Sequence, residues 1–447
     1  MEEHKHIVLV NAWHDDNKGD SAITEGTLRI LRNAFDQYGV KAKFTVVGLN
    51  EAGQLAATAT RHVSTSWPEA VILPAQMPTE LRSGVIARPW IDVPVWLARL
   101  VPSVAATLLG RTPRTLKKLV SQADAIVVVG GSNLHDSTSV NFLASAARLY
   151  TLIAPIPSAV GAGRPVLLLG HTLGPFPDER RLASAMARRM IGLADLAVVR
   201  EAESIPVAEC LGIARIELAP DMAFALDPRA TPRVRAVVEA LAVPAGQTAV
   251  VAVRRHPYLG CGADARIIDE LASTIGGLVA QGSCRAVMVV AHTIGPTPIE
   301  DDRYLSQVLT HRIRGQYPNL PVVYLQDDLS ASELAWLYGQ MACMIAVRLH
   351  AAILAMLTGT PTFAIAYFTH KTTGVMSAMG LADCVGDFAT VRSADIISAL
   401  SPRLGSAAAR KELAETCAGY RAQLEDRCLA WVAEHILKSG AGDRRSA

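Results

Sequence analysis

The feature that most constrains this chain is a recurring order of short apolar runs, each followed by a polar or glycine-containing junction. In the first half these runs are Ala125–Val129, Pro165–Leu169, Asp195–Val199 and Ile216–Leu218. Strands that are buried on both faces of a parallel sheet have this continuous apolar character. The pattern therefore predicts an α/β fold with parallel sheets.

The N-terminal residues predict the βαβ unit that opens such a sheet. An apolar strand at Ile7–Asn11 leads through a polar turn into a helix-like segment, and a second strand is expected at Lys43–Leu49. Residues 51–115 are rich in Thr, Pro and Ala, and we expect them to form an irregular excursion or lid.

Chain length and proline placement predict two domains. At 447 residues the chain exceeds one compact core, since domains commonly have about 100–200 residues. The proline-containing stretch 226–247 separates the first strand series from a second one. We expect a Rossmann-like domain at 1–228, a second at 245–400 facing it across a cleft, and a helical tail at 401–447.

Composition excludes several classes of protein. The 43 basic and 41 acidic residues are scattered and leave a net charge of +2, which argues against a nucleic-acid partner. The 7 cysteines are widely spread without a CxxC pair, so we expect neither a disulfide framework nor a zinc site, and no metal or cofactor. The N-terminus lacks the order of a signal peptide, and Pro89–Leu109, the nearest approach to a membrane helix, is interrupted by charges and prolines. These features predict a cytoplasmic protein whose Pro89–Leu109 segment could contact a membrane surface.

The most informative constellation is Arg348-Leu-His350, which follows an apolar run at Ile345–Val347 and precedes a helix that ends near Gly359. We expect that helix to begin at about His350. If Arg348 to His350 is extended, both side chains point the same way and converge at a helix N-terminus, a natural anion site. The alternative is an Arg–carboxylate pair within the protein and a His that only packs.

Other candidate binding residues also follow predicted strands, where open α/β sheets place their ligands. Arg254 and Arg255 end the first strand of the second domain, and only one of them is expected to face the site. Asn17 and Asp20 lie at the first βα junction, although Asp20 could simply cap the helix that follows.

A glycine pair marks a second junction. Gly130, Gly131 and Asn133 follow a strand, and the glycines could bring backbone N–H groups close to a ligand. The GxGxxG spacing is missing, which argues against NAD or FAD. The sequence His-Thr-x-Gly-Pro starts at His171 and again at His292, an echo that suggests an old duplication or chance.

Taken in order, these motifs resemble the polysaccharide pyruvyl transferase family. The matching pieces are Asn17–Asp20, Gly130–Gly131, His171–Phe176, Val199-Arg200, Glu203-Ser204, Pro220–Phe224, Arg348–His350, Tyr367 and Lys371. One departure is Ser132, which stands where the family usually has a third consecutive glycine.

The resemblance implies two Rossmann-like domains of the GT-B type and an enzyme that uses phosphoenolpyruvate as donor. Such an enzyme moves the enolpyruvyl carbons onto two hydroxyls of a saccharide, or of a lipid-linked saccharide, and releases phosphate. Arg348, with Arg254 or Arg255, would hold the anion, and His350 would be the acid that protonates the methylene carbon. The resemblance also makes His171, Tyr367 and Lys371 substrate-binding candidates and places the saccharide on the first domain.

Two alternatives remain open from the sequence. One is a GT-B glycosyltransferase that uses a nucleotide sugar, in which Asp327, Asp328 or Glu333 would meet the donor. The other is a non-catalytic anion- or sugar-binding protein with the same fold.

Overall fold

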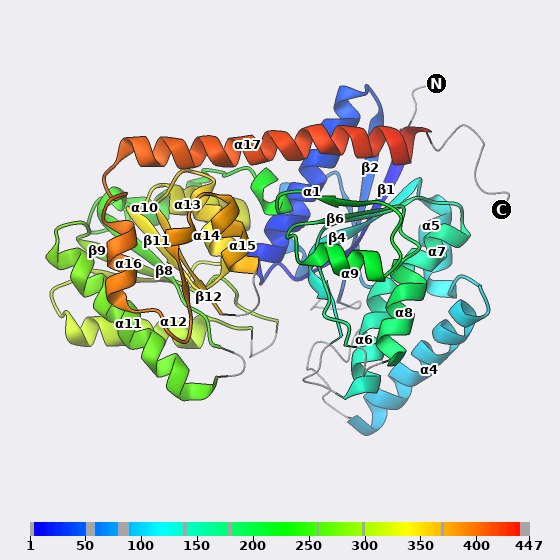
Figure 1. Ribbon diagram of the computed structural model, residues 1–447, viewed down its shortest axis with the longest axis horizontal. Coiled ribbons are helices and arrows are strands. Elements are labelled where there is room, and N and C mark those ends of the chain that lie inside the picture. Colours follow the sequence, from blue (N-terminus) through cyan, green and yellow to red (C-terminus); the bar gives the residue numbers. More distant parts are fainter. Residues whose placement is uncertain are drawn as a thin grey trace. The chain divides into compact units, whose positions relative to one another are not determined.

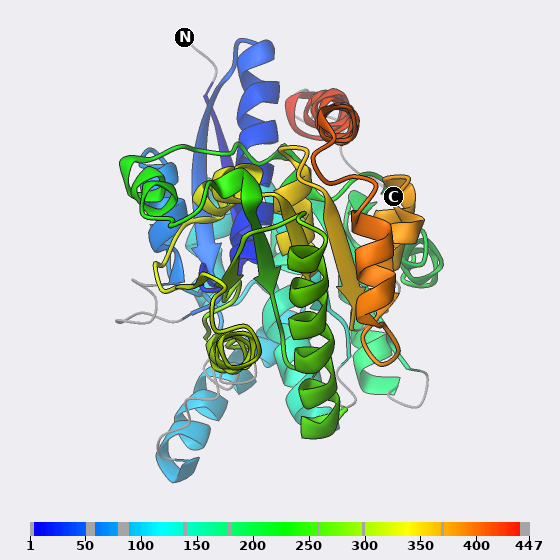
Figure 2. The same cartoon turned by 90° about the vertical axis from the view of Figure 1, so that its left-hand side faces the viewer.

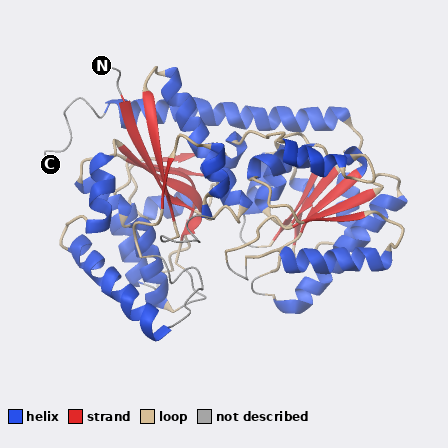
Figure 3. Ribbon diagram, turned by 180° about the vertical axis from the view of Figure 1, so that it is seen from behind, coloured by secondary structure: helices blue, strands red, loops and turns tan. Residues whose placement is uncertain are grey.

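The computed structural model describes residues 4–50, 59–78, 89–136, 141–177, 181–256, 259–296, 300–367 and 371–438 (Figure 1). These residues form two compact units. The first contains Met1–Asp15, Ile23–Ala225 and Ala422–Ala447, and the second contains Asp16–Ala22 and Leu226–Arg421. Each unit has a central sheet covered by helices (Figure 3).

The first unit is built on a seven-stranded sheet with the order β3-β2-β1-β4-β5-β6-β7, in which all pairs are parallel. Its strands are β1 His4–Ala12, β2 Lys41–Gly48, β3 Val71–Leu73, β4 Ala125–Leu134, β5 Val166–Leu173, β6 Leu196–Val199 and β7 Ile216–Leu218. The strand order reverses between β1 and β4, as in a doubly wound fold.

Helices follow most of these strands. They are α1 Lys18–Gln37, α3 Arg61–Ser66, α4 Pro89–Leu108, α5 Arg114–Gln122, α6 Phe142–Ile153, α7 Pro155–Gly161, α8 Arg181–Ile191 and α9 Ser204–Cys210. Helix α1 starts in the segment Asp16–Ala22, which packs with the second unit. A 3₁₀ turn, Met222–Ala225, closes the first unit.

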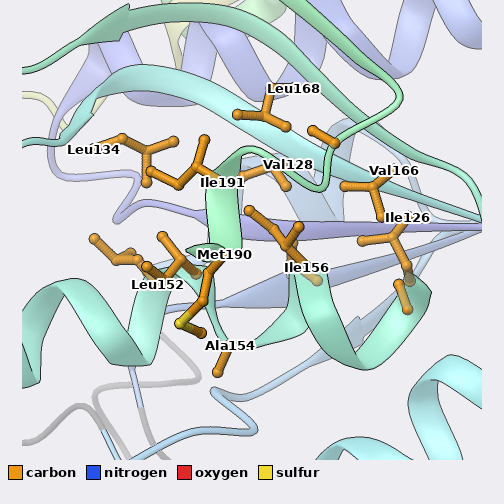
Figure 4. Packing of buried hydrophobic residues seen from close by; sticks show 14 of the residues in the cluster. Ile126, Val128, Leu134, Leu152, Ala154, Ile156, Val166, Leu168, Met190 and Ile191 are labelled. Atoms are coloured by element: carbon orange, nitrogen blue, oxygen red, sulfur yellow. The ribbon is translucent and has the colours of Figure 1, made fainter. Parts of the chain in front are cut away.

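Apolar side chains from alternate strand positions form the core of this unit. Ile126 and Val128 of β4 lie beside Val166 and Leu168 of β5. Helices α6, α7 and α8 cover that face of the sheet with Leu152, Ala154, Ile156, Met190 and Ile191 (Figure 4). Each large side chain buried in this way contributes about 1.5–3 kcal/mol to folding.

The second unit has a six-stranded parallel sheet with the order β10-β9-β8-β11-β12-β13. Its strands are β8 Thr248–Ala252, β9 Ala286–Val290, β10 Val322–Leu325, β11 Cys343–Ala346, β12 Thr362–Ala366 and β13 Val385–Asp387. The prediction of two doubly wound α/β domains is confirmed.

The helices of the second unit lie on both sides of its sheet. They are α10 Pro232–Glu239, α11 Gly260–Ala280, α12 Arg303–Gln316, α13 Ala331–Gly339, α14 Leu349–Met356, α15 Lys371–Ala378, α16 Ser393–Leu400 and α17 Ala407–Trp431. Helix α11 packs beside α12 and α16, whereas α13 packs with α14 (Figures 1 and 2). Helix α17, followed by a π-helical turn at Val432–Leu437, is the expected helical tail.

The structure differs from the predicted ranges in three places. Asp16–Ala22 belongs to the second unit although it was expected in the first, and the tail is divided between the units after Arg421. Residues 51–115 were predicted to be irregular, yet their described parts contain α3, β3 and α4. Pro94 and Pro102 lie inside α4, and because proline usually interrupts helices the sequence did not indicate a helix there. Residues 51–58 and 79–88 of that stretch lie outside the described residues.

One helical stretch of the described chain, Phe142–Gly161, is long and apolar enough to cross a membrane. About two thirds of it, 67%, is buried inside the protein. Leu149, Leu152, Ile153 and Ile156 belong to the core described above. The helix pair α6–α7 therefore packs as the core of the first unit.

Candidate functional site

The site is built at the carboxyl edge of the second sheet. The strand order reverses between β8 and β11, which is the place where doubly wound folds bind ligands. Arg254 follows β8, and Arg348 follows β11. The backbone N–H of Val347 donates to the carbonyl of Ala252 at 2.8 Å, so the two strand ends are held together. Two arginines thus flank the reversal point.

Arg348 is paired within the protein. Its Nε and Nη2 donate to the two carboxylate oxygens of Asp302 at 3.0 and 2.7 Å, and Nη2 also donates to the carbonyl of Glu300. Burial raises the pKa of Asp302, and the guanidinium of Arg348 opposes this rise. The bidentate geometry favours the ionised pair. The alternative considered for Arg348, an internal Arg–carboxylate pair, is therefore the observed one.

The geometry predicted for Arg348 and His350 is wrong in one respect. Helix α14 begins at Leu349, with Arg348 as its extended N-cap residue, so His350 is already helical. Side-chain alternation along a strand does not apply to the two residues.

Arg254 is the arginine that remains available to bind a ligand. Its guanidinium lies 4.2 Å from the ring centre of Tyr367, and Nη1 donates to the Tyr367 hydroxyl. Among the residues that the structure describes, no carboxylate forms an ion pair with it, and its buried Nε has no hydrogen-bond partner. Burial of a charge without a paired group is costly, so this guanidinium favours binding of an anionic ligand.

Arg255 points elsewhere. Its Nε donates to Asp264 at 3.0 Å, and 47% of its side chain is exposed. Only one of the two adjacent arginines therefore takes part in the cluster, and Arg254 is that one.

Tyr367 and Lys371 extend the site beyond β12. Lys371 begins α15, and its charge acts on Tyr367. Burial alone would raise the pKa of Tyr367, but the charges of Lys371, Arg254 and Arg348 more than offset it and lower that pKa to about 8. The shift records a positive field at this edge of the sheet.

His350 packs directly on Gly19. A Cβ added to Gly19 would lie 2.2 Å from Nδ1 of His350 and 2.7 Å from its Cβ. Only glycine can therefore occupy position 19 while His350 keeps this place. The first βα junction of the chain thus fixes the imidazole of the Arg-Leu-His motif.

The rest of that junction also belongs to the second unit. Asn17 forms an isolated bridge with Thr293, and its side chain accepts from the N–H of Gly19 at 3.2 Å. Asn17, and not Asp20, thereby occupies the cap position, since α1 starts at Lys18. Asp20 accepts a hydrogen bond from the side chain of Asn17 at 2.6 Å. Neither residue sits with the first unit, where an acceptor-binding role had placed them.

Lys18, His292 and Asp302 were not among the predicted site residues, although Lys18 lies inside the Asn17–Asp20 motif and His292 begins the second His-Thr-x-Gly-Pro copy. The Lys18 ammonium is 2% exposed and lies 2.5 Å from Asp328. His292 is buried after β9 with Nδ1 3.3 Å from the Tyr338 hydroxyl. Burial lowers its pKa well below the usual value, and the charges of Arg348, His350 and Lys18 add to this. The signals available for His292 were its position at a strand end and its place in the repeated His-Thr-x-Gly-Pro motif.

His292 and its neighbour keep unused polar atoms. Within the described residues, Nε2 of His292 and Oγ1 of Thr293 are buried without a hydrogen-bond partner. Native proteins rarely leave such atoms unsatisfied except at functional sites or where water binds. They lie in the same cluster as Lys18 and Arg348.

The predicted site residues of the first unit contact other parts of that unit. Gly130 and Gly131 lie inside β4, and a Cβ on Gly130 would meet the Gly170 carbonyl at 2.4 Å. The pair therefore permits close contact with β5 and does not form the expected turn. The carbonyl of Asn133 accepts from Arg148. His171 is buried with Nε2 3.1 Å from the Val128 carbonyl, and burial lowers its pKa to about 4.

Other family motifs of this unit meet in a buried network around Arg200. Its guanidinium lies 2.6 Å from Asp221 and donates to Thr172 at 2.9 Å. It also donates to the hydroxyl of Ser132 at 2.8 Å. The serine that replaces the third glycine is thus a hydrogen-bond acceptor for Arg200.

The His-Thr-x-Gly-Pro echo occupies unlike positions in the two sheets. The first copy begins inside β5, the fifth strand of its sheet, and the second begins after β9, the second strand of its sheet. Both Gly–Pro bonds, after Gly174 and Gly295, are cis. A duplication of the whole domain would place the copies after equivalent strands, so the positions do not support that origin.

Solved structures share the fold of the whole chain. A UDP-GlcNAc 2-epimerase from Neisseria meningitidis is 12% identical with a TM-score of 0.52, and the match covers 97% of this chain and 100% of that one. A UDP-glucosyltransferase from Polygonum tinctorium is also 12% identical, with a TM-score of 0.54 and coverage of 99% and 100%. The chain thus has a GT-B-like fold of two Rossmann-like domains.

The match to a protein family is more specific than the similarity of fold. The model of the polysaccharide pyruvyl transferase family matches residues 17–369, from the Asn17 junction to just beyond Tyr367. The amylovoran biosynthesis protein AmsJ of Erwinia amylovora is 27% identical over 307 residues, which are 62% of this chain and 65% of that protein. The chain belongs to the polysaccharide pyruvyl transferase family.

Proposed function

We propose that this protein transfers the enolpyruvyl group of phosphoenolpyruvate to a saccharide acceptor during exopolysaccharide synthesis in the cytoplasm. The observation that carries the proposal is Arg254, a partly buried guanidinium without a carboxylate partner among the described residues, at the reversal point of the second sheet. Phosphoenolpyruvate brings a phosphate and a carboxylate, both of which suit a guanidinium. Family membership supports the reaction class.

Each residue of the site has its own role in the proposed reaction. Arg254 binds the donor anion, with Lys371 adding to the positive field around Tyr367. Arg348 is held by Asp302, so most of its hydrogen-bonding capacity is committed, and it fixes the start of α14. His350, set against Gly19, is the proton donor.

The reaction balances with these groups alone. A proton from His350 goes to the methylene carbon of phosphoenolpyruvate, which becomes a methyl group, while a sugar hydroxyl attacks the adjacent carbon. A second hydroxyl of the same sugar then displaces phosphate at that carbon. The bond between that carbon and the phosphate ester oxygen breaks. The proton of one hydroxyl returns to the imidazole of His350, and the proton of the other leaves with phosphate. The products are a cyclic pyruvate ketal and inorganic phosphate.

The nucleotide-sugar alternative finds less support in the local structure. Glu333, one of its candidate donor ligands, forms the capping box of α13 with Ser330 and accepts from Thr231. Asp328 is the partner of Lys18. Only Asp327, 49% exposed, stays at the surface.

Two adjacent arginines allow a matched test that needs no acceptor. We expect phosphoenolpyruvate to raise the thermal stability of the protein, by about 2.7 kcal/mol at 100 times its dissociation constant. Arg254→Gln should weaken donor binding by about 10- to 100-fold, since a hydrogen bond to a charged group contributes about 1.5–3 kcal/mol. Arg255→Gln should bind the donor like the wild type.

Three results would count against the proposal. Stabilisation by UDP-sugars and not by phosphoenolpyruvate would favour the glycosyltransferase. Equal losses in Arg254→Gln and Arg255→Gln would move the donor away from the reversal point. Donor binding without turnover on any saccharide would favour a non-catalytic binding protein.

A further inference from the structure

Helix α4 carries an exposed apolar face. Its residues Val95, Leu97 and Val101 are 50%, 43% and 58% exposed, its last residue Leu108 is 68% exposed, and Leu109 in the following turn is 71% exposed. Figures 1 and 2 show α4 as an outlying helix of the first unit. Contiguous apolar surface of this kind usually marks an interaction site.

The opposite face fixes α4 to its unit. The Trp96 indole N–H donates to the Pro78 carbonyl at 2.9 Å. Ser103 and Thr107 both hydrogen-bond with the Tyr150 hydroxyl of α6, at 2.9 and 2.8 Å. The exposed face is therefore a defined surface of a docked helix.

The charged residues beyond the first turn of α4, which contains Asp92, are basic as far as Ala123. No Asp or Glu occurs from Val93 to Ala123, whereas the stretch contains Arg99, Arg111, Arg114, Lys117 and Lys118. All of these basic side chains are exposed. In α5 the buried residues Leu116, Leu119 and Val120 leave the basic ones on the solvent side.

The basic residues begin where α4 ends. The N–H of Arg111 donates to the Ala106 carbonyl at 2.8 Å, which folds the chain back on the last turn of α4. The basic helix α5 starts at Arg114, a few residues further on. Apolar side chains and cations are thus joined in one short segment of the first unit.

We propose that the exposed face of α4 and the basic face of α5 form a docking surface for an anionic lipid bilayer. Apolar side chains of an interfacial helix enter the boundary between headgroups and acyl chains, and nearby Lys and Arg are attracted to anionic lipids. The proposal does not depend on the transfer reaction.

A second copy of the chain fits this surface less well. A twofold contact would set the same patch against itself, so Lys117, Lys118 and their basic neighbours would face one another without any acidic residue of the segment between them. Like charges brought together in this way oppose association. An anionic bilayer supplies the missing negative charge.

The test is co-sedimentation of the full-length protein with vesicles. We expect binding to vesicles that contain phosphatidylglycerol, little binding to pure phosphatidylcholine, and a loss of binding at high salt. Val101→Ser/Leu108→Ser/Leu109→Ser should remove the binding. Lys117→Glu/Lys118→Glu should weaken it at least about 10-fold, since each basic residue near an anionic surface contributes about fivefold.

Matched controls lie on α8 of the same unit. Leu182→Ser alters a single apolar side chain that is 52% exposed, and Arg188→Glu/Arg189→Glu makes the same charge change on another surface. Both should bind vesicles like the wild type, and circular dichroism melting should show that every variant is folded.

Several outcomes would overturn the proposal. The first is that the wild-type protein does not bind anionic vesicles at low salt, and the second is that the α4 variant binds them normally. A third is an equal loss in the Arg188/Arg189 variant, which would indicate a general charge effect. The last outcome is measured by analytical ultracentrifugation. An α4 variant that dissociates an oligomer but binds vesicles unchanged would show that the exposed face serves self-association.

Discussion

Gly19→Ala tests whether the first βα junction positions the imidazole of His350. The added Cβ would lie 2.2 Å from Nδ1, 2.5 Å from Cγ and 2.7 Å from Cβ of His350. Rotation of the imidazole about χ1 relieves the first two contacts but not the third, because Cβ does not move in that rotation. The start of α1 or of α14 must therefore shift.

The expected effect is on turnover. Reaching ordinary van der Waals distance requires a displacement of about 1 Å at the imidazole, and an error of that size in a catalytic group costs about 10²-fold in rate. Arg254 does not contact Gly19, so the affinity for phosphoenolpyruvate should change by less than about threefold. Gly19→Ala should thus lower kcat and leave donor binding nearly unchanged.

The assay is transfer of isotope-labelled phosphoenolpyruvate to saccharide, with donor binding measured separately by calorimetry. Gly419→Ala is the control, because Gly419 lies in α17 and a Cβ there has no neighbour within 4 Å. That variant should keep full activity and gain slightly in stability, as Ala favours helices over Gly by about 1 kcal/mol.

A double-mutant cycle decides the mechanism. If Gly19→Ala acts through His350, it should have no further effect on kcat in a His350→Ala background. Full additivity of the two substitutions would refute the reasoning, as would a kcat for Gly19→Ala equal to that of Gly419→Ala.

Two further predictions concern the charges of the second unit. Asp302→Asn should destabilise that unit by about 3–5 kcal/mol in urea unfolding, because it leaves Arg348 buried without its charge partner; Asp383→Asn, whose carboxylate is 59% exposed beside Arg403, should cost less than about 1 kcal/mol. Tyr367 should titrate near pH 8 in tyrosinate absorbance, a step absent in Tyr367→Phe and moved upward by bound phosphoenolpyruvate. Since its folded pKa lies below the unfolded value of 10.0, the contribution of Tyr367 to stability should grow as pH rises from about 8 to 10 and disappear as pH falls through 8.

The fold was predictable because buried parallel strands are apolar along their whole length. The runs at Ala125–Val129 and Pro165–Leu169 became β4 and β5, although both strands continue through the glycines that were interpreted as turns. Helix α4 was missed because Pro94 and Pro102 argue locally against a helix, and the packing of Trp96 and Leu100 outweighs that local preference.

Part of the site was predictable for the same reason. Parallel strands end at one edge of the sheet, so residues that follow β8, β11 and β12 had to lie along it: Arg254 contacts Tyr367 there, and His350 lies in the first turn of the helix that follows β11. The sequence could not assign the partners of these groups. Lys18 pairs with Asp328, 310 residues away, and no local pattern encodes that contact.

The pairing of Arg348 with Asp302 changes how the Arg-Leu-His motif works. Both arginines flank the reversal point, but among the described residues Arg254 forms no ion pair with a carboxylate and feels Asp302 and Glu300 only at longer range, whereas Arg348 gives its donors to Asp302. Asp302 also accepts from the N–H of Thr293, so the same carboxylate joins the ends of β9 and β11. The ion pair therefore positions the helix that carries His350, and in the proposed mechanism the substrate anion is bound by Arg254 at the end of the neighbouring strand. If the proposed mechanism holds, Arg348 of this motif stabilises the site and His350 supplies the proton.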